Sequence, residues 1–116
     1  MSLKEVLDKI RNEVDEQPIE YYPKFEENSV IIDVRETDEY NGGYLPGAIH
    51  IPRGVLEFKL SNMPEIKKDT HILLYCRSGN RSLYAARSLN ELGYEKVTSL
   101  KGGYVAWAAA NPTTLA

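Results

Sequence analysis

The chain has 116 residues, a length typical of one domain. Its 14 basic and 17 acidic side chains give a formal net charge of −3, which argues against nucleic-acid binding. No apolar run approaches the about 20 residues of a membrane helix, the N-terminus lacks a secretory signal, and one cysteine excludes an internal disulfide or a multi-thiolate zinc site. We therefore expect a cytoplasmic domain with no nucleic-acid or membrane partner, and we predict no metal site and no cofactor.

The spacing of apolar residues predicts helices and strands in alternation. A helix is expected over residues 3–14, where Ser2 and Glu5 have the spacing of a capping box. The acidic stretch 15–28, which contains two prolines, is expected to be an irregular lead-in. Alternation of this kind is typical of a mainly parallel sheet with helices on both faces, here in a single domain of residues 1–116. The remaining elements are predicted as strands at 30–34, 48–51, 72–75 and 96–100, and helices near 55–63, 80–92 and 103–111.

The segment most informative about chemistry is the loop of residues 76–81, Cys-Arg-Ser-Gly-Asn-Arg. It follows a buried strand and precedes a helix, and ligands bind at that edge of an open parallel sheet. Its amides and those of the first helical turn can form a cradle for an anion, because Gly79 allows a positive φ. Arg77 and Arg81 add positive charge, and such surroundings favour the thiolate form of a cysteine. We therefore predict that Cys76 is a nucleophile whose sulfur is within reach of solvent.

Other interpretations of these residues are open at this point. Free cysteine is among the most buried residue types, so an inert Cys76 in the core is the alternative to a nucleophile. A Cys–His pair is not predicted, since His71 begins the strand about 16 Å from Cys76 and His50 is expected to have a structural or rim role. Asp33 and Arg35 either brace the loop or pair on the surface.

Four segments resemble motifs of the rhodanese (thiosulfate sulfurtransferase) family, and they occur along the chain in the same order as in that family. Residues 76–82 resemble its active-site loop, residues 40–51 its upstream motif and residues 100–107 its C-terminal motif. Asp33-Val34-Arg35 resembles a strand-end motif frequent in the family. This resemblance, over about residues 17–112, implies a rhodanese-like three-layer α/β/α domain with a mainly parallel five-stranded central sheet.

The resemblance also implies what the loop does. Cys76 would take sulfane sulfur from a small anionic donor such as thiosulfate and hold it as a persulfide. Because the chain has no second cysteine, an external thiol or a protein acceptor would then remove the sulfur. The substrate-binding residues would be the rest of the loop, namely Arg77, Ser78, Gly79, Asn80 and Arg81.

Two alternative functions accompany this hypothesis. A sulfur carrier or regulatory module that serves a partner protein would use the same residues. Phosphatases and arsenate reductases of this fold place five residues between the Cys and the Arg, which encloses a larger anion. Only four residues separate Cys76 from Arg81, so these activities are less favoured.

Overall fold

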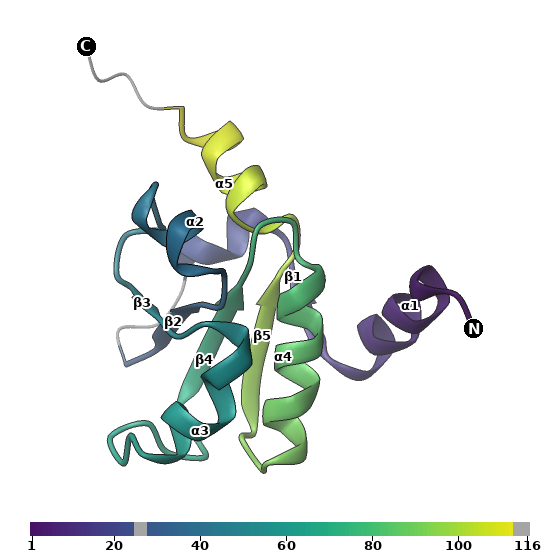
Figure 1. Ribbon diagram of the computed structural model, residues 1–116, viewed down its shortest axis with the longest axis vertical. Helices are drawn as coiled ribbons and strands as arrows, with labels where there is room; N and C mark the ends of the chain where they lie inside the picture. Colours follow the sequence, from purple (N-terminus) through teal and green to yellow (C-terminus); the bar gives the residue numbers. More distant parts are fainter. Residues whose placement is uncertain (25–27, 113–116) are drawn as a thin grey trace.

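The computed structural model describes residues 1–24 and 28–112. In this part of the chain, a sheet of five parallel strands has the order β1-β5-β4-β2-β3 (Figure 1). The predicted α/β class and the parallel five-stranded sheet are confirmed. The strands are β1 (Asp15–Gln17), β2 (Val30–Asp33), β3 (Ala48–His50), β4 (His71–Tyr75) and β5 (Lys96–Leu100). The helices are α1 (Leu3–Glu13), α2 (Thr37–Asn41), α3 (Leu56–Ser61), α4 (Asn80–Glu91) and α5 (Gly103–Ala110), with 3₁₀ turns η1 (Ile19–Lys24) and η2 (Arg53–Val55).

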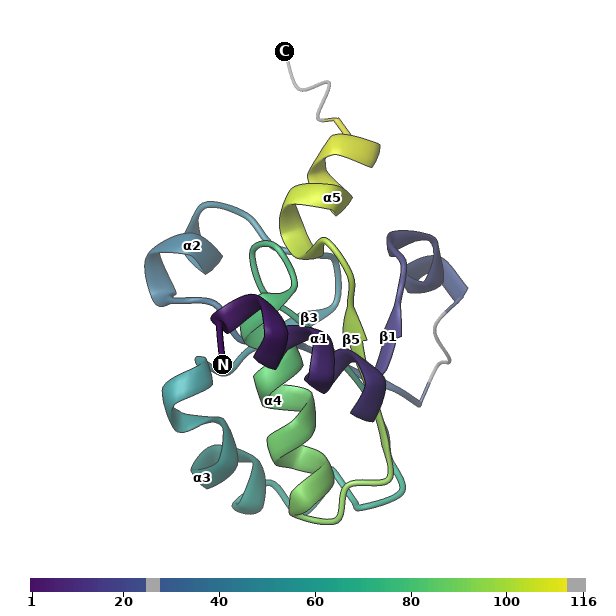
Figure 2. The ribbon, with the colours of Figure 1, turned by 90° about the vertical axis from the view of Figure 1, so that its right-hand side faces the viewer.

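Helical elements cover both faces of the sheet (Figures 1 and 2). The side chains of β4 point alternately to the two faces and pack against different helices on each. Ile72 and Leu74 are fully buried in a cluster with the apolar residues of α3 and α4. Leu73 and Tyr75 point to the other face and are buried with residues of η1 and α5. Helix α1 packs outside α4, where Leu7, Ile10 and Leu83 form a third cluster. The result is the expected three-layer arrangement.

The prediction of an irregular lead-in at 15–28 is wrong at its start and in its middle. Residues 15–17 form the edge strand β1, although Asp-Glu-Gln contains no apolar residue. This strand exists because it pairs with β5, with Asp15 opposite Thr98 and Gln17 opposite Leu100, and not because of its own β-propensity. Turn η1 follows it, and residues 25–27 lie outside the described part of the chain.

The sheet register brings the ends of three strands to one edge. Asp33 at the end of β2 lies opposite Tyr75 at the end of β4, and Leu74 lies opposite Ser99 of β5. The segment that follows β4 is therefore flanked by the segments that follow β2 and β5. The first turns of α4 and α5 meet there (Figure 2). None of the helices in residues 1–24 and 28–112 is long and apolar enough to cross a membrane.

Candidate active site

The loop after β4 wraps around the sulfur of Cys76. Gly79 adopts the left-handed conformation predicted for it, with φ of 102°, and caps the start of α4. This turn aims two backbone donors at the sulfur: the N–H of Gly79 at 3.1 Å and the N–H of Ser82 at 3.4 Å from Sγ. The sulfur therefore lies at the N-terminus of α4, where unpaired amides and the helix dipole favour negative charge.

Two buried serine hydroxyls extend this hydrogen-bonded shell. The Ser82 Oγ lies 3.6 Å from the sulfur and donates to the Gly79 carbonyl at 3.1 Å. The hydroxyl of Ser99, on β5, donates to the Ser82 oxygen at 2.8 Å. Neither serine is among the site residues predicted from the sequence. Ser82 directly follows the loop and was identifiable, whereas only the sheet register brings Ser99 to this position.

The sulfur is not open to solvent, contrary to the expectation from the sequence. Cys76 is only 1% exposed and belongs to the apolar cluster beneath α4. The reason is that the same tight turn that directs the amides inward also closes the loop over the thiol. In this conformation a dissolved reactant does not reach Cys76.

Helix α5 holds the loop from the other side. Its first-turn N–H groups, on Tyr104 and Val105, donate to the carbonyls of Cys76 at 2.8 Å and Arg77 at 3.0 Å. These are the donors that a helix leaves unpaired at its N-terminus, so the loop caps α5. Gly103 makes the close approach possible, because a Cβ there would collide with the Cys76 carbonyl oxygen.

The guanidinium of Arg81 is paired with a carboxylate. It forms a two-point ion pair with Glu39 of α2, at 3.0 and 3.1 Å. The hydrogen bond from Arg81 holds the pKa of Glu39 below its ordinary value, and the same bond raises the pKa of Arg81. From the sequence, the charge of Arg81 was expected to bind the donor anion. In this structure that charge is instead neutralised by the Glu39 carboxylate.

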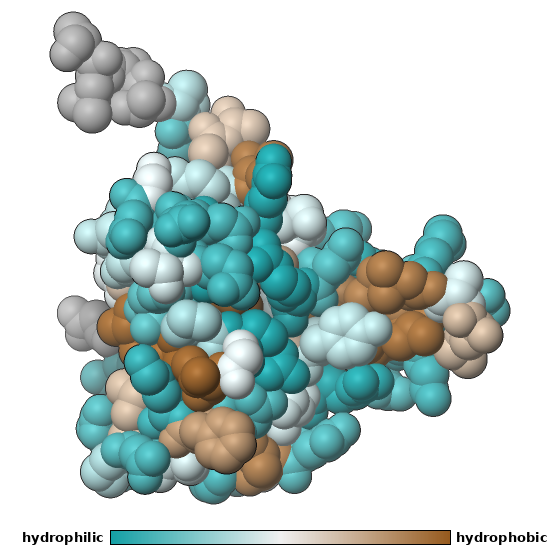
Figure 3. All heavy atoms as spheres, in the orientation of Figure 1, coloured by the Kyte–Doolittle hydropathy of each residue, from teal (hydrophilic) through white to brown (hydrophobic). Residues whose placement is uncertain are grey.

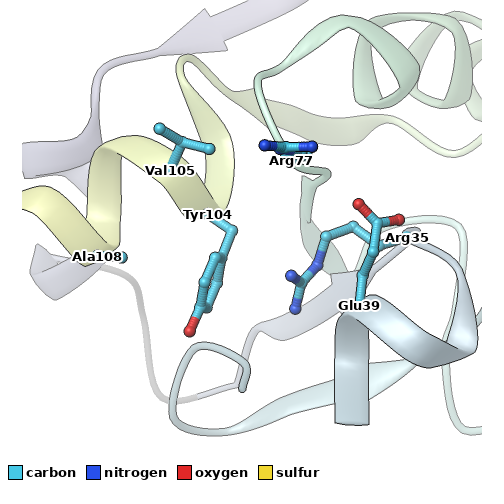
Figure 4. Close-up of a pocket in the computed structure, with 6 residues that line it drawn as sticks. All are labelled: Arg35, Glu39, Arg77, Tyr104, Val105 and Ala108. Carbon is cyan, nitrogen blue, oxygen red and sulfur yellow. The ribbon is translucent and has the colours of Figure 1, made fainter. Parts of the chain in front are cut away.

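The other loop side chains face outward. Arg77 is exposed and lines an open pocket of about 400 Å³, beside Arg35, Glu39 and the first two turns of α5 (Figure 4). Within the described residues, its guanidinium has no hydrogen bond or ion pair. Ser78 is exposed, and the Asn80 Oδ1 accepts a 3.5 Å bond from Arg11 of α1. Of the two loop arginines, Arg77 is thus the one whose charge is uncompensated.

Asp33 and Arg35 form a buried pair, so the alternative of a surface ion pair is wrong. Their side chains are 0% and 4% exposed, and the Arg35 Nη2 donates to Asp33 at 2.7 Å. Asp33 also accepts the hydroxyl of Tyr75 at 2.7 Å. Burial and this bond raise the pKa of Tyr75 far above its ordinary range, so the phenol remains a donor. Because Tyr75 precedes Cys76 and Arg35 stacks on the Tyr104 ring at 4.3 Å, this group braces the loop.

The two histidines have structural contacts. The His50 Nε2 lies 2.8 Å from the Arg35 carbonyl, and its ring stacks on Tyr40 with a centroid separation of 4.5 Å. His71 is at the opposite end of β4 from Cys76, with its Nε2 3.2 Å from the Thr98 hydroxyl. Among residues 1–24 and 28–112, no group of three His, Cys, Asp or Glu side chains is placed to hold a metal ion.

Comparisons with known proteins identify the family of this chain. A sulfurtransferase of Allochromatium vinosum is 34% identical over 97 residues, covering 84% of this chain and 88% of that protein. The thiosulfate sulfurtransferase GlpE of Tolumonas auensis is 33% identical over 84 residues, covering 72% of this chain and 76% of that protein. A solved Rhodopseudomonas palustris structure, described as a possible tyrosine phosphatase, superposes with a TM-score of 0.81 at 28% identity, covering 95% of this chain and 91% of that one. The profile of the rhodanese-like domain matches residues 17–110, and the chain therefore belongs to the rhodanese-like family.

Proposed function

We propose that this chain is a sulfurtransferase that carries sulfane sulfur as a persulfide on Cys76. The observation that supports this most directly is the placement of Sγ, with two backbone N–H donors within 3.4 Å at the N-terminus of α4. An inert packing cysteine has no need of such donors, whereas a thiolate or a persulfide anion is stabilised by them. Family membership and the named sulfurtransferase relatives support the same reaction class.

The first half-reaction is a displacement at sulfur. The Cys76 thiolate attacks the outer sulfur of thiosulfate, a new S–S bond forms, and the S–S bond within the donor breaks. Its electron pair leaves with sulfite, so a thiolate and a dianion become a persulfide anion and a dianion. In this proposal, the amides of Gly79 and Ser82, which donate to Sγ, stabilise the anionic sulfur during this step.

Arg77 is the residue best placed to attract the donor. It is exposed at the edge of the loop, and its charge is unpaired among the described residues. Arg81 instead has a positioning role, because its ion pair with Glu39 fixes the first turn of α4 relative to α2. This division of roles refines the expectation that both arginines bind the donor.

The burial of Cys76 requires the loop to open before reaction. The donor reaches the sulfur only when residues of the loop, or the first turn of α5 that holds the Cys76 carbonyl, move apart. If the loop never opens, Cys76 is the inert core cysteine that remains as the alternative. The two cases differ in whether the thiol can be loaded with sulfur.

Intact-protein mass after incubation with thiosulfate tests the proposal. The protein is expected to gain one sulfur atom, to lose it as thiocyanate when cyanide is added, and to gain nothing in the Cys76→Ser variant. Absence of both the added sulfur and thiocyanate, with thiosulfate and with inorganic polysulfide as the donor, would refute the proposal.

The same samples distinguish the alternative functions. Hydrolysis of an aryl phosphate without sulfur loading would assign a phosphatase, the activity suggested for the Rhodopseudomonas palustris protein. Complete loading with negligible turnover to cyanide or small thiols would assign a sulfur carrier that serves a protein partner. Loading with steady production of thiocyanate is the result expected for the sulfurtransferase.

A further inference from the structure

The pocket beside the loop has walls of two chemical kinds. Arg77, Arg35 and Glu39 form a charged wall, whereas Tyr104, Val105 and Ala108 of α5 form an apolar wall (Figure 4). The apolar wall belongs to α5, which donates to the carbonyls of Cys76 and Arg77, and Arg77 of the charged wall is itself a residue of the loop. A molecule in this pocket therefore lies directly against the cysteine loop.

The charged wall carries one positive charge without a partner. Asp33 pairs with Arg35 at 2.7 Å, and Arg81 pairs with Glu39 at 3.0 Å, so these charges cancel locally. Arg77 has no such partner among residues 1–24 and 28–112. Of the two guanidinium groups that line the pocket, only that of Arg77 is thus without a partner, which suits one carboxylate or a comparable anion.

The apolar wall has no use in capturing an inorganic donor. Val105 is 49% exposed although it is fully apolar, and α5 shows apolar surface in the upper part of Figure 3. Thiosulfate has five non-hydrogen atoms, all polar or anionic, and gains nothing from contact with valine and alanine. The volume of about 400 Å³ falls in the range of sites for small organic ligands, about 300–1,000 Å³.

We infer that the sulfur acceptor is a small organic thiol with one anionic group and a short apolar chain. Its anionic group pairs with Arg77, and its chain covers Val105 and Ala108. This inference rests on the proposed function and specifies its second half-reaction. Cys76 does not line the pocket, so the acceptor reaches the outer sulfur through the same opening of the loop that admits the donor.

The transfer step balances without any further reactant. The acceptor thiolate attacks the outer sulfur of the Cys76 persulfide and forms a new S–S bond. The S–S bond to Sγ breaks, and its electron pair remains on Cys76 as the thiolate. The product is the organic persulfide, and the amides of Gly79 and Ser82 stabilise the released thiolate.

Single-turnover kinetics with matched thiols test the inference. The protein is first loaded with thiosulfate, or with inorganic polysulfide where loading is incomplete, and freed of excess donor. It is then mixed with 3-mercaptopropionate, 3-mercapto-1-propanol or 3-aminopropane-1-thiol at equal thiolate concentration, and loss of the persulfide is followed by mass. The anionic thiol is expected to react about fivefold faster than the neutral one, and the cationic thiol is expected to be slowest.

Substitutions assign the preference to the two walls. Arg77→Gln is expected to remove the advantage of the anionic thiol, whereas Arg87→Gln, at an arginine that does not line the pocket, is expected to retain it. Extending the acceptor to 5-mercaptopentanoate is expected to increase the rate by up to about fourfold for each methylene that the wall covers. Val105→Ser is expected to diminish this gain, and Val55→Ser, at an exposed valine outside the pocket, is expected to preserve it.

The outcomes separate this inference from the proposed function. Equal rates for the three short thiols, or an anionic preference that survives Arg77→Gln, would overturn the acceptor assignment while sulfur loading still supports a sulfurtransferase. Failure of the wild-type protein to acquire sulfur from either donor would overturn both.

Discussion

At Gly103 the backbone leaves β5 for α5 and passes directly over the cysteine loop. Its φ of 54° is in the left-handed region, and a Cβ at this position would collide with carbonyl oxygens of Cys76 and Arg77. The first N–H groups of α5 bind those same oxygens. One glycine thus permits the contact that holds both the loop and the last helix.

Gly103→Ala is therefore expected to be strongly destabilising. The left-handed backbone and the collision with two carbonyls together are expected to lower the free energy of unfolding by about 2–3 kcal/mol. Gly54→Ala is the matched control, because Gly54 has an ordinary φ and no atom within 4 Å of an added Cβ. Urea unfolding of both variants measures the difference. Equal stability of the two variants would contradict the contact described here.

Helix α2 has five residues and none of them is buried, yet it carries a contact of the site. Glu39 reaches from this helix to Arg81, 42 residues away in sequence. A short helix without an apolar face gives no periodic signal in the sequence, so this helix was not predicted. Besides this ion pair, the helix contributes the ring of Tyr40, which stacks on His50 and Tyr44.

The ion pair of Glu39 predicts a pH-dependent contribution to stability. The hydrogen bond from Arg81 lowers the pKa of Glu39 below its ordinary value of 4.5, so the folded state favours the carboxylate. The contribution is therefore fully present above pH 4.5 and is lost as the pH falls through the lowered pKa. Both side chains are partly exposed, so Glu39→Gln is expected to cost no more than about 1 kcal/mol at pH 7.

Urea unfolding of the wild type and Glu39→Gln between pH 7 and pH 3 measures this dependence. The difference between the two proteins is expected to shrink toward zero at the acid end. Glu91→Gln, at an exposed residue of α4, is expected to show no such trend. A difference for Glu39→Gln that stays constant over the range would show that the lost stability does not come from the carboxylate.

The longer elements were predictable because their own residues carry the pattern. The buried β-branched run of β2, the apolar run of β4 and the helical spacing of α1 and α4 all gave elements near their observed bounds. Strand β1 was not predictable from its residues, since its pairing with β5 depends on a neighbour about 80 residues away. A strand such as β1 forms only because its partner strand is already present in the folded sheet.

At the scale of the whole molecule, the site combines predictable and unpredictable parts. The loop, its left-handed Gly79 and the position of Cys76 at a strand end followed from local sequence. The burial of Cys76, the Ser99 hydroxyl and the pairing of Arg81 did not, because each depends on residues from other strands and helices. The charge that a loop presents is therefore known only after its partners are placed.

The buried group around Asp33 is where these separate segments are joined. Asp33 ends β2, Tyr75 ends β4, and the Tyr75 oxygen also accepts the Leu45 N–H at 3.1 Å. Arg35 adds a bond to the Gly43 carbonyl and the contact with the Tyr104 ring of α5. Sheet, upstream loop and last helix thus share one polar cluster beneath the cysteine loop.

Arg35→Leu is expected to destabilise the whole fold, since it leaves the Asp33 carboxylate buried without its cation. Removal of one partner of a buried pair costs about 3–5 kcal/mol, and the bonds that Asp33 retains from Tyr75 and the backbone place the expected loss near the lower value. Arg53→Leu is the matched control, because Arg53 and Glu57 form a pair whose side chains are 30% and 29% exposed, and its loss is expected to be below about 1 kcal/mol. Urea unfolding at pH 7 measures both. If the two substitutions lower the free energy of unfolding equally, the Asp33 cluster does not join the segments as described. The closed conformation of the loop would then depend on α5 and the Glu39–Arg81 pair alone.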